Sequence, residues 1–128
     1  DTYNANPDSV RAAIGVVADV PALNGSSRTV VLGMMGELGR FAEEMHLQIG
    51  EHAARNQLQV ISVGVEAARI AEGAKRAGGS VVEHFDRYED AVNWLKGTLR
   101  PGDTVLFKGS RKAAVERVMN AVFPPTTN

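Results

Sequence analysis

Short apolar runs and helical stretches follow one another along this chain, and that succession restricts the fold more than any other feature of the sequence. The apolar runs do not alternate with polar residues, which is typical of strands buried on both faces. Each run is followed by a stretch in which apolar residues recur every three or four positions, the spacing of an amphipathic helix. The succession predicts an α/β domain, in which a mainly parallel sheet is flanked by helices on both faces.

The expected elements fit one domain of ordinary composition. We expect strands at residues 29–32, 59–63, 81–85 and 104–107, and helices at residues 7–20, 40–56, 66–76, 86–95 and 112–123. The 128 residues, 44% of them hydrophobic and 23% charged, suffice for a globular domain with a sizeable core. A net charge of −1 gives no electrostatic case for nucleic acid or for an anionic membrane. The chain has no cysteine, which excludes disulfides and thiolate metal sites, and no apolar run approaches the roughly 20 residues that span a bilayer.

The segment Lys108-Gly109-Ser110-Arg111 joins the last expected strand to the last expected helix. Ligands of open α/β sheets bind beyond the carboxyl ends of the strands, so this segment is a candidate binding loop. Two cations, a hydroxyl group and the free amides of a helix N-terminus would suit a carboxylate or a phosphate. Alternatively, Ser110 is simply the N-cap of the last helix, and the two basic side chains lie in solvent. The spacing alone leaves both interpretations open.

A second candidate loop covers residues 33–39 and has one charged side chain, Glu37, among glycines spaced by three. This loop is neither a phosphate-binding Gly-Lys-Ser/Thr motif nor a good dinucleotide fingerprint. Glu37 could orient a cation or an ammonium group, or lie in solvent. His46, in the helix that follows, could be a packed residue or a ligand. His52 and His84 have no partner at metal-binding spacing, and no metal site is predicted.

The first nine residues form a loop that runs into the first expected helix. The triplet Asn6-Pro7-Asp8 suits an N-cap, a first helical position and an acidic first turn, respectively. Capping does not explain Asp1, Tyr3 and Asn4, three further side chains that can hydrogen-bond a ligand. A chain that opens on such a cluster, without a strand before it, is expected to be a piece of a larger protein.

Taken together, these segments resemble the C-terminal domain of a Mur ligase. The segments occur in the family's order and extend over nearly the whole chain: residues 1–9, residues 33–39, His46 with Gly50, and Lys108-Gly109-Ser110-Arg111. The resemblance implies that residues 1–128 form one Rossmann-like, three-layer domain of a cytoplasmic bacterial enzyme of peptidoglycan synthesis. A UDP-sugar domain and a central ATPase domain, both absent from this sequence, would complete that enzyme.

The implied reaction adds D-alanyl-D-alanine to UDP-N-acetylmuramoyl-tripeptide. ATP would phosphorylate the tripeptide carboxylate, and the dipeptide amine would then attack the acyl phosphate. Mg²⁺ would be held mainly by the central domain. We expect no catalytic residue in this domain alone, and therefore no ligase activity from the isolated domain.

The resemblance also implies two sets of site residues. Contacts to ATP, made where the domain closes on its neighbour, would come from Asp1, Tyr3, Asn4 and Asn6. The pocket for D-alanyl-D-alanine would comprise Lys108, Ser110 and Arg111, which hold its carboxylate, with Glu37 and His46 beside them.

Two alternatives compete with this interpretation. The first is a stand-alone signalling domain similar to a response-regulator receiver, for which Lys108 after a late strand would be suitable. A receiver also needs an acidic pair after its first strand and a phosphoacceptor aspartate after its third, which residues 33–35 and 64–65 do not provide. The second is a small nucleotide- or anion-binding module without catalysis, which weak ATP binding by this chain alone would favour.

Overall fold

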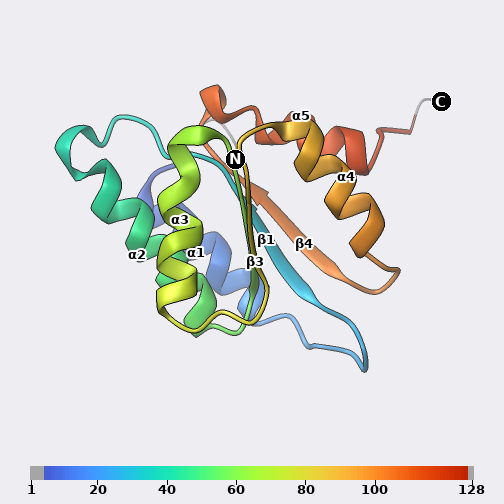
Figure 1. The fold of residues 1–128 in the computed structure, drawn as a ribbon. Helices are drawn as coiled ribbons and strands as arrows, with labels where there is room; N and C mark the ends of the chain where they lie inside the picture. The colour runs from blue at the N-terminus through green and yellow to red at the C-terminus, as the bar shows by residue number, and fades with distance from the viewer. Residues whose placement is uncertain (1–4, 127–128) are drawn as a thin grey trace.

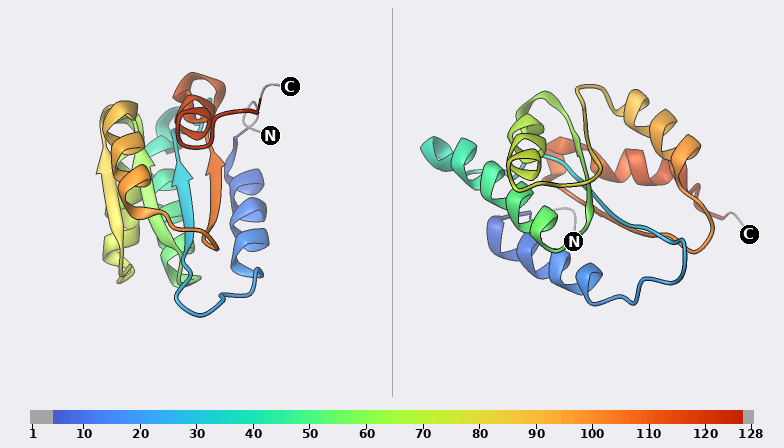
Figure 2. Two further views of the ribbon diagram at one scale, coloured as in Figure 1. Left: turned by 90° about the vertical axis from the view of Figure 1, so that its right-hand side faces the viewer. Right: turned by 60° about the horizontal axis from the view of Figure 1, so that its bottom comes forward.

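The computed structural model describes residues 5–126, which contain one parallel β-sheet. Its strands lie in the order β3-β2-β1-β4, and every neighbouring pair is parallel. The left-hand view of Figure 2 shows the strands side by side and pointing the same way. Their bounds are β1 (Arg28–Leu32), β2 (Gln59–Val63), β3 (Val82–Phe85) and β4 (Thr104–Lys108). The predicted parallel sheet is confirmed, and the strand bounds differ from the expected ones by no more than one residue at any end.

Helices cover both faces of the sheet, so the predicted three-layer α/β architecture is also confirmed. In Figure 1, α1, α2 and α3 lie on one side of the sheet, and α4 and α5 lie on the other. The helices are α1 (Pro7–Ala18), α2 (Ala42–Arg55), α3 (Ala68–Arg76), α4 (Tyr88–Thr98) and α5 (Val115–Val122). Short 3₁₀ turns precede three of them: η1 (Gly39–Phe41), η2 (Val65–Ala67) and η3 (Arg111–Ala113). Each helix of residues 5–126 is too short or too polar to span a lipid bilayer.

The strands are apolar without alternation because each face of the sheet has its own core. In β1, Val30 and Leu32 belong to the core under α1, α2 and α3, whereas Val31 belongs to the core under α4 and α5. All three are at most 1% exposed. Side chains of a strand point alternately to its two faces, so two buried faces require a continuous apolar run.

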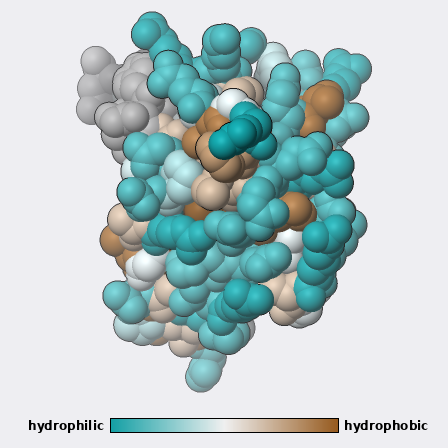
Figure 3. All heavy atoms as spheres, turned by 90° about the vertical axis from the view of Figure 1, so that its left-hand side faces the viewer, coloured by the Kyte–Doolittle hydropathy of each residue, from teal (hydrophilic) through white to brown (hydrophobic). Residues whose placement is uncertain are grey.

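Two glycines bring the backbones of α2 and α3 into direct contact. A Cβ atom at Gly50 would overlap the carbonyl oxygen of Ile70, and one at Gly73 would overlap that of Leu47. On the outer surface the two helices are joined by the ion pair of Arg69 with Glu43, at 3.5 Å. Figure 3 shows the left-hand side of Figure 1 as mostly hydrophilic, with small hydrophobic patches between the polar side chains.

The chain after β4 departs from the expected helix of residues 112–123. It forms η3, passes through Ala114 in the left-handed conformation at φ 55°, and only then enters α5. The reason lies in the packing of Val115, which is 1% exposed, against the ends of β1 and β4. A Cβ atom at Gly33 would lie 2.5 Å from Cγ2 of Val115, and one at Gly109 would lie 2.7 Å from it. Val115 therefore packs over these two glycines, and the chain enters α5 only at this residue.

Candidate functional site

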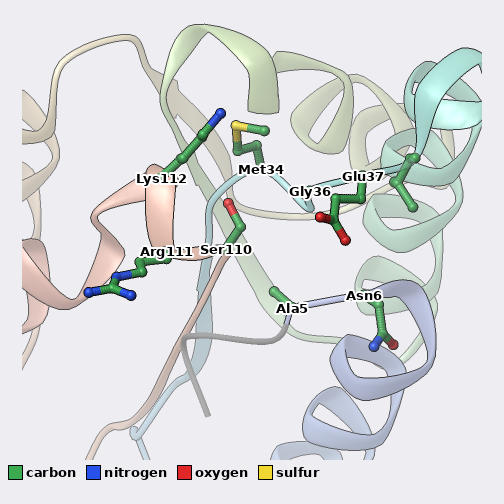
Figure 4. Close-up of a pocket in the computed structure, with 9 residues that line it drawn as sticks. Ala5, Asn6, Met34, Gly36, Glu37, Ser110, Arg111 and Lys112 are labelled. Carbon is green, nitrogen blue, oxygen red and sulfur yellow. The ribbon is translucent and has the colours of Figure 1, made fainter.

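A cavity of about 470 Å³ lies at the carboxyl ends of β1 and β4. Three segments that are far apart in the sequence form its walls, namely the start of α1, the loop after β1 and the loop after β4 (Figure 4). The lining residues are Ala5, Asn6, Met34, Gly36, Glu37, Leu38, Ser110, Arg111 and Lys112. The two loops that the sequence singled out as candidate binding loops therefore meet in one cavity, because β1 and β4 are neighbours in the sheet.

The loop after β1 is tied to the loop after β4 by backbone hydrogen bonds. The amide of Gly33 donates to the carbonyl of Lys108 at 2.9 Å, and the amide of Ser110 donates to the carbonyl of Met34 at 2.8 Å. Further along the first loop, Glu37 has a φ of 60°, a conformation that residues with a Cβ atom rarely adopt. Figure 4 shows its carboxylate directed into the space between the two loops and α1. Strain of this kind persists only where the surroundings hold the backbone firmly.

Ser110 occupies the N-cap position of η3, but its side chain does not cap the last helix, so that part of the alternative interpretation of its loop is wrong. Its side chain forms no capping hydrogen bond with η3, and α5 begins only at Val115. Instead the hydroxyl points toward the cavity in Figure 4. Among the described residues, its Oγ is the buried side-chain polar atom without a hydrogen-bond partner. A buried hydroxyl without a partner is costly, which makes this atom a candidate for contact with a ligand.

The cations of the Lys-Gly-Ser-Arg motif do not converge as the sequence suggested. Lys108 is 6% exposed and does not line the cavity. Arg111 lines it, but in Figure 4 its side chain extends away from Glu37 and Ser110. Lys112, which the sequence analysis did not single out, also lines the cavity and is exposed. The expected amides of a helix N-terminus are replaced by those of η3, because α5 starts later in the chain.

His46 is buried behind the loop after β1 and does not line the cavity. Its Nε2 accepts a hydrogen bond from the amide of Met35 at 2.9 Å, and its Nδ1 lies 2.6 Å from the carbonyl oxygen of Ala42. The sequence left open whether His46 is a packed residue or a ligand. The structure makes it a packed residue in contact with the cavity wall.

The start of α1 is fixed by the predicted N-cap. Oδ1 of Asn6 accepts from the amide of Ser9 at 2.9 Å, and Oγ of Ser9 accepts from the amide of Asn6 at 3.0 Å. Pro7 is the first residue of the helix, and Asp8 lies in its first turn, as expected. The other residues assigned to ATP, Asp1, Tyr3 and Asn4, lie outside the described residues.

A second polar cluster lies at the carboxyl ends of β2 and β3. Oγ of Ser62 is 2.6 Å from Nδ1 of His84, and Nε2 of His84 is 2.8 Å from Oδ1 of Asp86. Ser62 is fully buried, so its hydroxyl is closed to any substrate. The sequence missed this cluster because its members belong to two strands whose pairing the sequence does not specify. No group of three or more His, Asp or Glu side chains within residues 5–126 could hold a metal ion.

Known proteins similar to this chain extend over nearly its full length. The family described as "Mur ligase, glutamate ligase domain" matches residues 1–111. The UDP-N-acetylmuramoyl-tripeptide–D-alanyl-D-alanine ligase of Treponema pallidum is 39% identical over 123 residues, which is 92% of this chain and 26% of that protein. The ligase of the same name from Escherichia coli is 37% identical over 125 residues, 95% of this chain and 26% of that protein.

The solved structures that resemble this chain are also Mur ligases. A MurF from Acinetobacter baumannii superposes with a TM-score of 0.81 at 32% identity, over 95% of this chain and 27% of that one. A MurF ligase from Thermotoga maritima, solved in complex with ADP, superposes with a TM-score of 0.76 at 29% identity, over 95% of this chain and 26% of that one. The chain thus spans about a quarter of the length of the relatives that it matches.

Proposed function

The chain belongs to the Mur ligase family, and from that premise we propose that it is the C-terminal domain of the ATP-dependent ligase that adds D-alanyl-D-alanine to UDP-N-acetylmuramoyl-tripeptide. Two relatives that cover more than nine-tenths of the chain carry that name, which supports the choice of reaction. Because each match is about a quarter of the relative's length, the activity is proposed for a three-domain enzyme. Residues 1–128 would be one domain of it, beside a UDP-sugar domain and a central ATPase domain.

The observation that carries this proposal is the meeting of three sequence motifs around one cavity. Asn6 comes from the opening motif, Glu37 from the loop after β1, and Ser110 from the Lys-Gly-Ser-Arg loop, and all three line the cavity. The three motifs are far apart in the sequence, and the pairing of β1 with β4 brings two of them together. The meeting of Glu37 and Ser110 at one cavity supports a common ligand, and Asn6 adds the capped start of α1 to the cavity wall.

The charges around the cavity suit a zwitterion such as D-alanyl-D-alanine. We assign its carboxylate to the hydroxyl of Ser110 and to the exposed cations of Arg111 and Lys112, with the Arg111 side chain rotating inward on binding. We assign its ammonium group to Glu37, whose carboxylate faces the cavity. Lys108 is buried and does not line the cavity, so its charge would act on the dipeptide carboxylate without direct contact.

The contacts to ATP are proposed for Asp1, Tyr3, Asn4 and Asn6, the segment that would meet the central domain when the domains close. The side-chain oxygen of Asn6 already caps α1, so Asn6 would contribute to ATP binding by fixing the start of the helix. The described residues do not fit Mg²⁺, since they contain no cluster of acidic or histidine ligands. The ion would be held by the central domain, and we assign it no step on this chain.

The chain's share in the reaction would be positioning. ATP phosphorylates the tripeptide carboxylate and leaves as ADP. The ammonium group of the dipeptide then releases a proton to solvent, and the resulting amine attacks the acyl carbon. The bond from the acyl carbon to the phosphate oxygen breaks, phosphate leaves, and a second proton passes from the nitrogen to solvent as the amide forms. Holding the amine near the acyl phosphate turns a bimolecular step into an intramolecular one. Such a reaction uses ATP and a nucleotide sugar, which is consistent with the proposed bacterial cytoplasm.

A titration of the chain with D-alanyl-D-alanine, followed by backbone NMR, tests the proposal. We expect shifts to cluster at residues 36–38 and 110–112, and N-acetyl-D-alanyl-D-alanine, which lacks the ammonium group, to bind more weakly. Shifts caused by ATP but not by the dipeptide would favour the anion-binding module instead. If neither ligand causes shifts here or in an enzyme that carries all three domains, the proposed pocket is wrong.

A further inference from the structure

Both ring nitrogens of His46 are bonded to backbone groups, and the donors and acceptors fix its protonation. The amide of Met35 donates to Nε2 at 2.9 Å. An amide nitrogen can only donate, so Nε2 carries no proton. The proton therefore lies on Nδ1, which donates to the carbonyl oxygen of Ala42 at 2.6 Å. These two contacts require a neutral ring in a single tautomer.

The bond to Met35 holds the cavity wall from the α2 side. Met35 is itself 2% exposed, while the residues on either side of it, Met34 and Gly36, line the cavity. On the other side, the amide of Ser110 holds the carbonyl of Met34 at 2.8 Å. Two successive residues of the loop are therefore fixed from two different elements. Glu37, at a φ of 60°, follows after Gly36 and needs such support to keep its strained backbone.

His46 has no remaining atom with which to bind a ligand by hydrogen bonding. It is 3% exposed, it does not line the cavity, and each nitrogen already has a backbone partner. A direct contact with substrate would require the loop to leave its present position.

We propose that His46 is a positioning residue of the dipeptide pocket: its neutral, Nδ1-protonated ring fixes the loop after β1 so that Glu37 faces the cavity, and it touches no substrate. The proposal rests on the proposed function for the identity of the ligand, although the effect on the loop does not depend on it. The resemblance placed His46 beside the pocket, and the proposal gives it an action there through Met35.

Two variants of similar polarity each keep only one of the two hydrogen bonds that the His46 ring makes, with Met35 or with Ala42. In His46→Gln the side-chain oxygen can occupy the position of Nε2 and keep the acceptor for the amide of Met35. In His46→Asn the shorter side chain places its amide near the position of Nδ1, which keeps the contact with Ala42 but loses the one with Met35. A role confined to helix α2 or to the core would make the two variants alike.

The test combines amide exchange with dipeptide binding, both measured by NMR on the whole chain. We expect the Met35 amide to exchange roughly tenfold faster in His46→Asn than in His46→Gln, because a buried amide loses its acceptor. We also expect D-alanyl-D-alanine to bind roughly tenfold more weakly to the Asn variant, with the Gln variant close to the unchanged chain. Equal exchange and equal affinity in the two variants would overturn the proposal.

The position of the ring proton of His46 can be measured in the unchanged chain, so this test does not depend on whether a variant folds. Nitrogen NMR should find the proton of His46 on Nδ1, and a proton on Nε2 would overturn the proposal. If the dipeptide does not bind to the unchanged chain while the Met35 exchange still separates Asn from Gln, the proposed ligand fails and the positioning role stands. The two proposals can thus fail separately.

Discussion

The hydroxyl of Ser110 is buried beside the cavity without a hydrogen-bond partner among the described residues. Burying such a group without a partner costs about 1–3 kcal/mol, and removing it recovers that cost. We therefore expect Ser110→Ala to leave the free energy of unfolding unchanged, or to raise it by about 1 kcal/mol. The same change should weaken D-alanyl-D-alanine binding roughly tenfold, because the ligand would supply the missing partner. Urea denaturation and the NMR titration measure the two effects.

Ser62→Ala is the matched control for this prediction. The hydroxyl of Ser62 is also buried, but it is bonded to Nδ1 of His84 at 2.6 Å and lies away from the cavity. Its removal should lower the free energy of unfolding by about 1 kcal/mol and leave dipeptide binding as it was. Equal destabilisation by the two substitutions would mean that the Ser110 hydroxyl serves the fold and not the ligand.

Asp103 gives the chain a predictable response to acid. The amides of Ser27 and Arg100 donate to its carboxylate at 2.8 and 2.9 Å, and these bonds lower its pKa from 3.8. A carboxyl whose pKa is lower in the folded chain stabilises the fold above its unfolded pKa, and this stabilisation is lost as the pH falls through the folded pKa. We expect Asp103→Asn to reduce the free energy of unfolding at pH 7 and to reduce its loss in acid. Denaturation curves between pH 7 and pH 2 measure both effects. If the two proteins lose stability in parallel, the two hydrogen bonds of Asp103 do not account for the response to acid.

At the scale of elements, the contact between α2 and α3 depends on Gly50. Alanine favours helices more than glycine does, by roughly 1 kcal/mol, so propensity alone predicts that Gly50→Ala stabilises α2. The carbonyl oxygen of Ile70 occupies the place of the added Cβ, however, and the two backbones would have to separate. Since overpacking a well-packed core costs about 1–3 kcal/mol and sometimes more, we expect a net loss of stability, measured as a lower thermal midpoint.

Gly97→Ala provides the opposite case in α4. No heavy atom lies within 4 Å of the added Cβ there, so only the gain in helix propensity remains. We expect this variant to be more stable by roughly 0.5–1 kcal/mol. If both variants raise the thermal midpoint, helix propensity decides at Gly50 and the close contact of the two helices does not.

The elements were largely predictable because their signals are local. The Asn6-Pro7-Asp8 triplet marked the start of α1, and the apolar run of residues 59–63 became β2 without change. The last helix was wrong at its start because Val115 and Val118 keep the helical spacing, while the turn at Ala114 comes from packing against Gly33 and Gly109. Asp86, at the expected start of the fourth helix, is bonded to His84 instead, and the helix begins at Tyr88. In both cases a partner distant in the sequence decided the local conformation.

For the whole molecule, the site follows from strand order. Leu32 and Lys108 face each other in register, so the loops after β1 and β4 meet although these two residues are 76 positions apart in the sequence. The sequence located both loops but could not predict this pairing, and it therefore could not show that Lys112 lines the cavity and Lys108 does not. Which motif residues line the cavity, and which lie behind it, depends on the direction in which each side chain leaves its strand.

A last prediction concerns how the domains of the proposed enzyme divide the binding of dipeptide, ATP and Mg²⁺ between them. The described residues supply charges for a zwitterionic dipeptide but no ligands for a metal ion, and the proposed ATP contacts close on another domain. Residues 1–128 alone, given ATP, Mg²⁺, UDP-N-acetylmuramoyl-tripeptide and D-alanyl-D-alanine, should therefore form no amide, as measured by mass spectrometry of the product. In an enzyme that carries all three domains, Arg111→Ala should raise KM for the dipeptide roughly tenfold through the loss of a charged hydrogen bond, while KM for the tripeptide substrate stays near its original value. Amide formation by residues 1–128 alone would show that the chain holds a complete ATP site, and an equal rise in both KM values would place Arg111 at the domain interface instead of the dipeptide carboxylate.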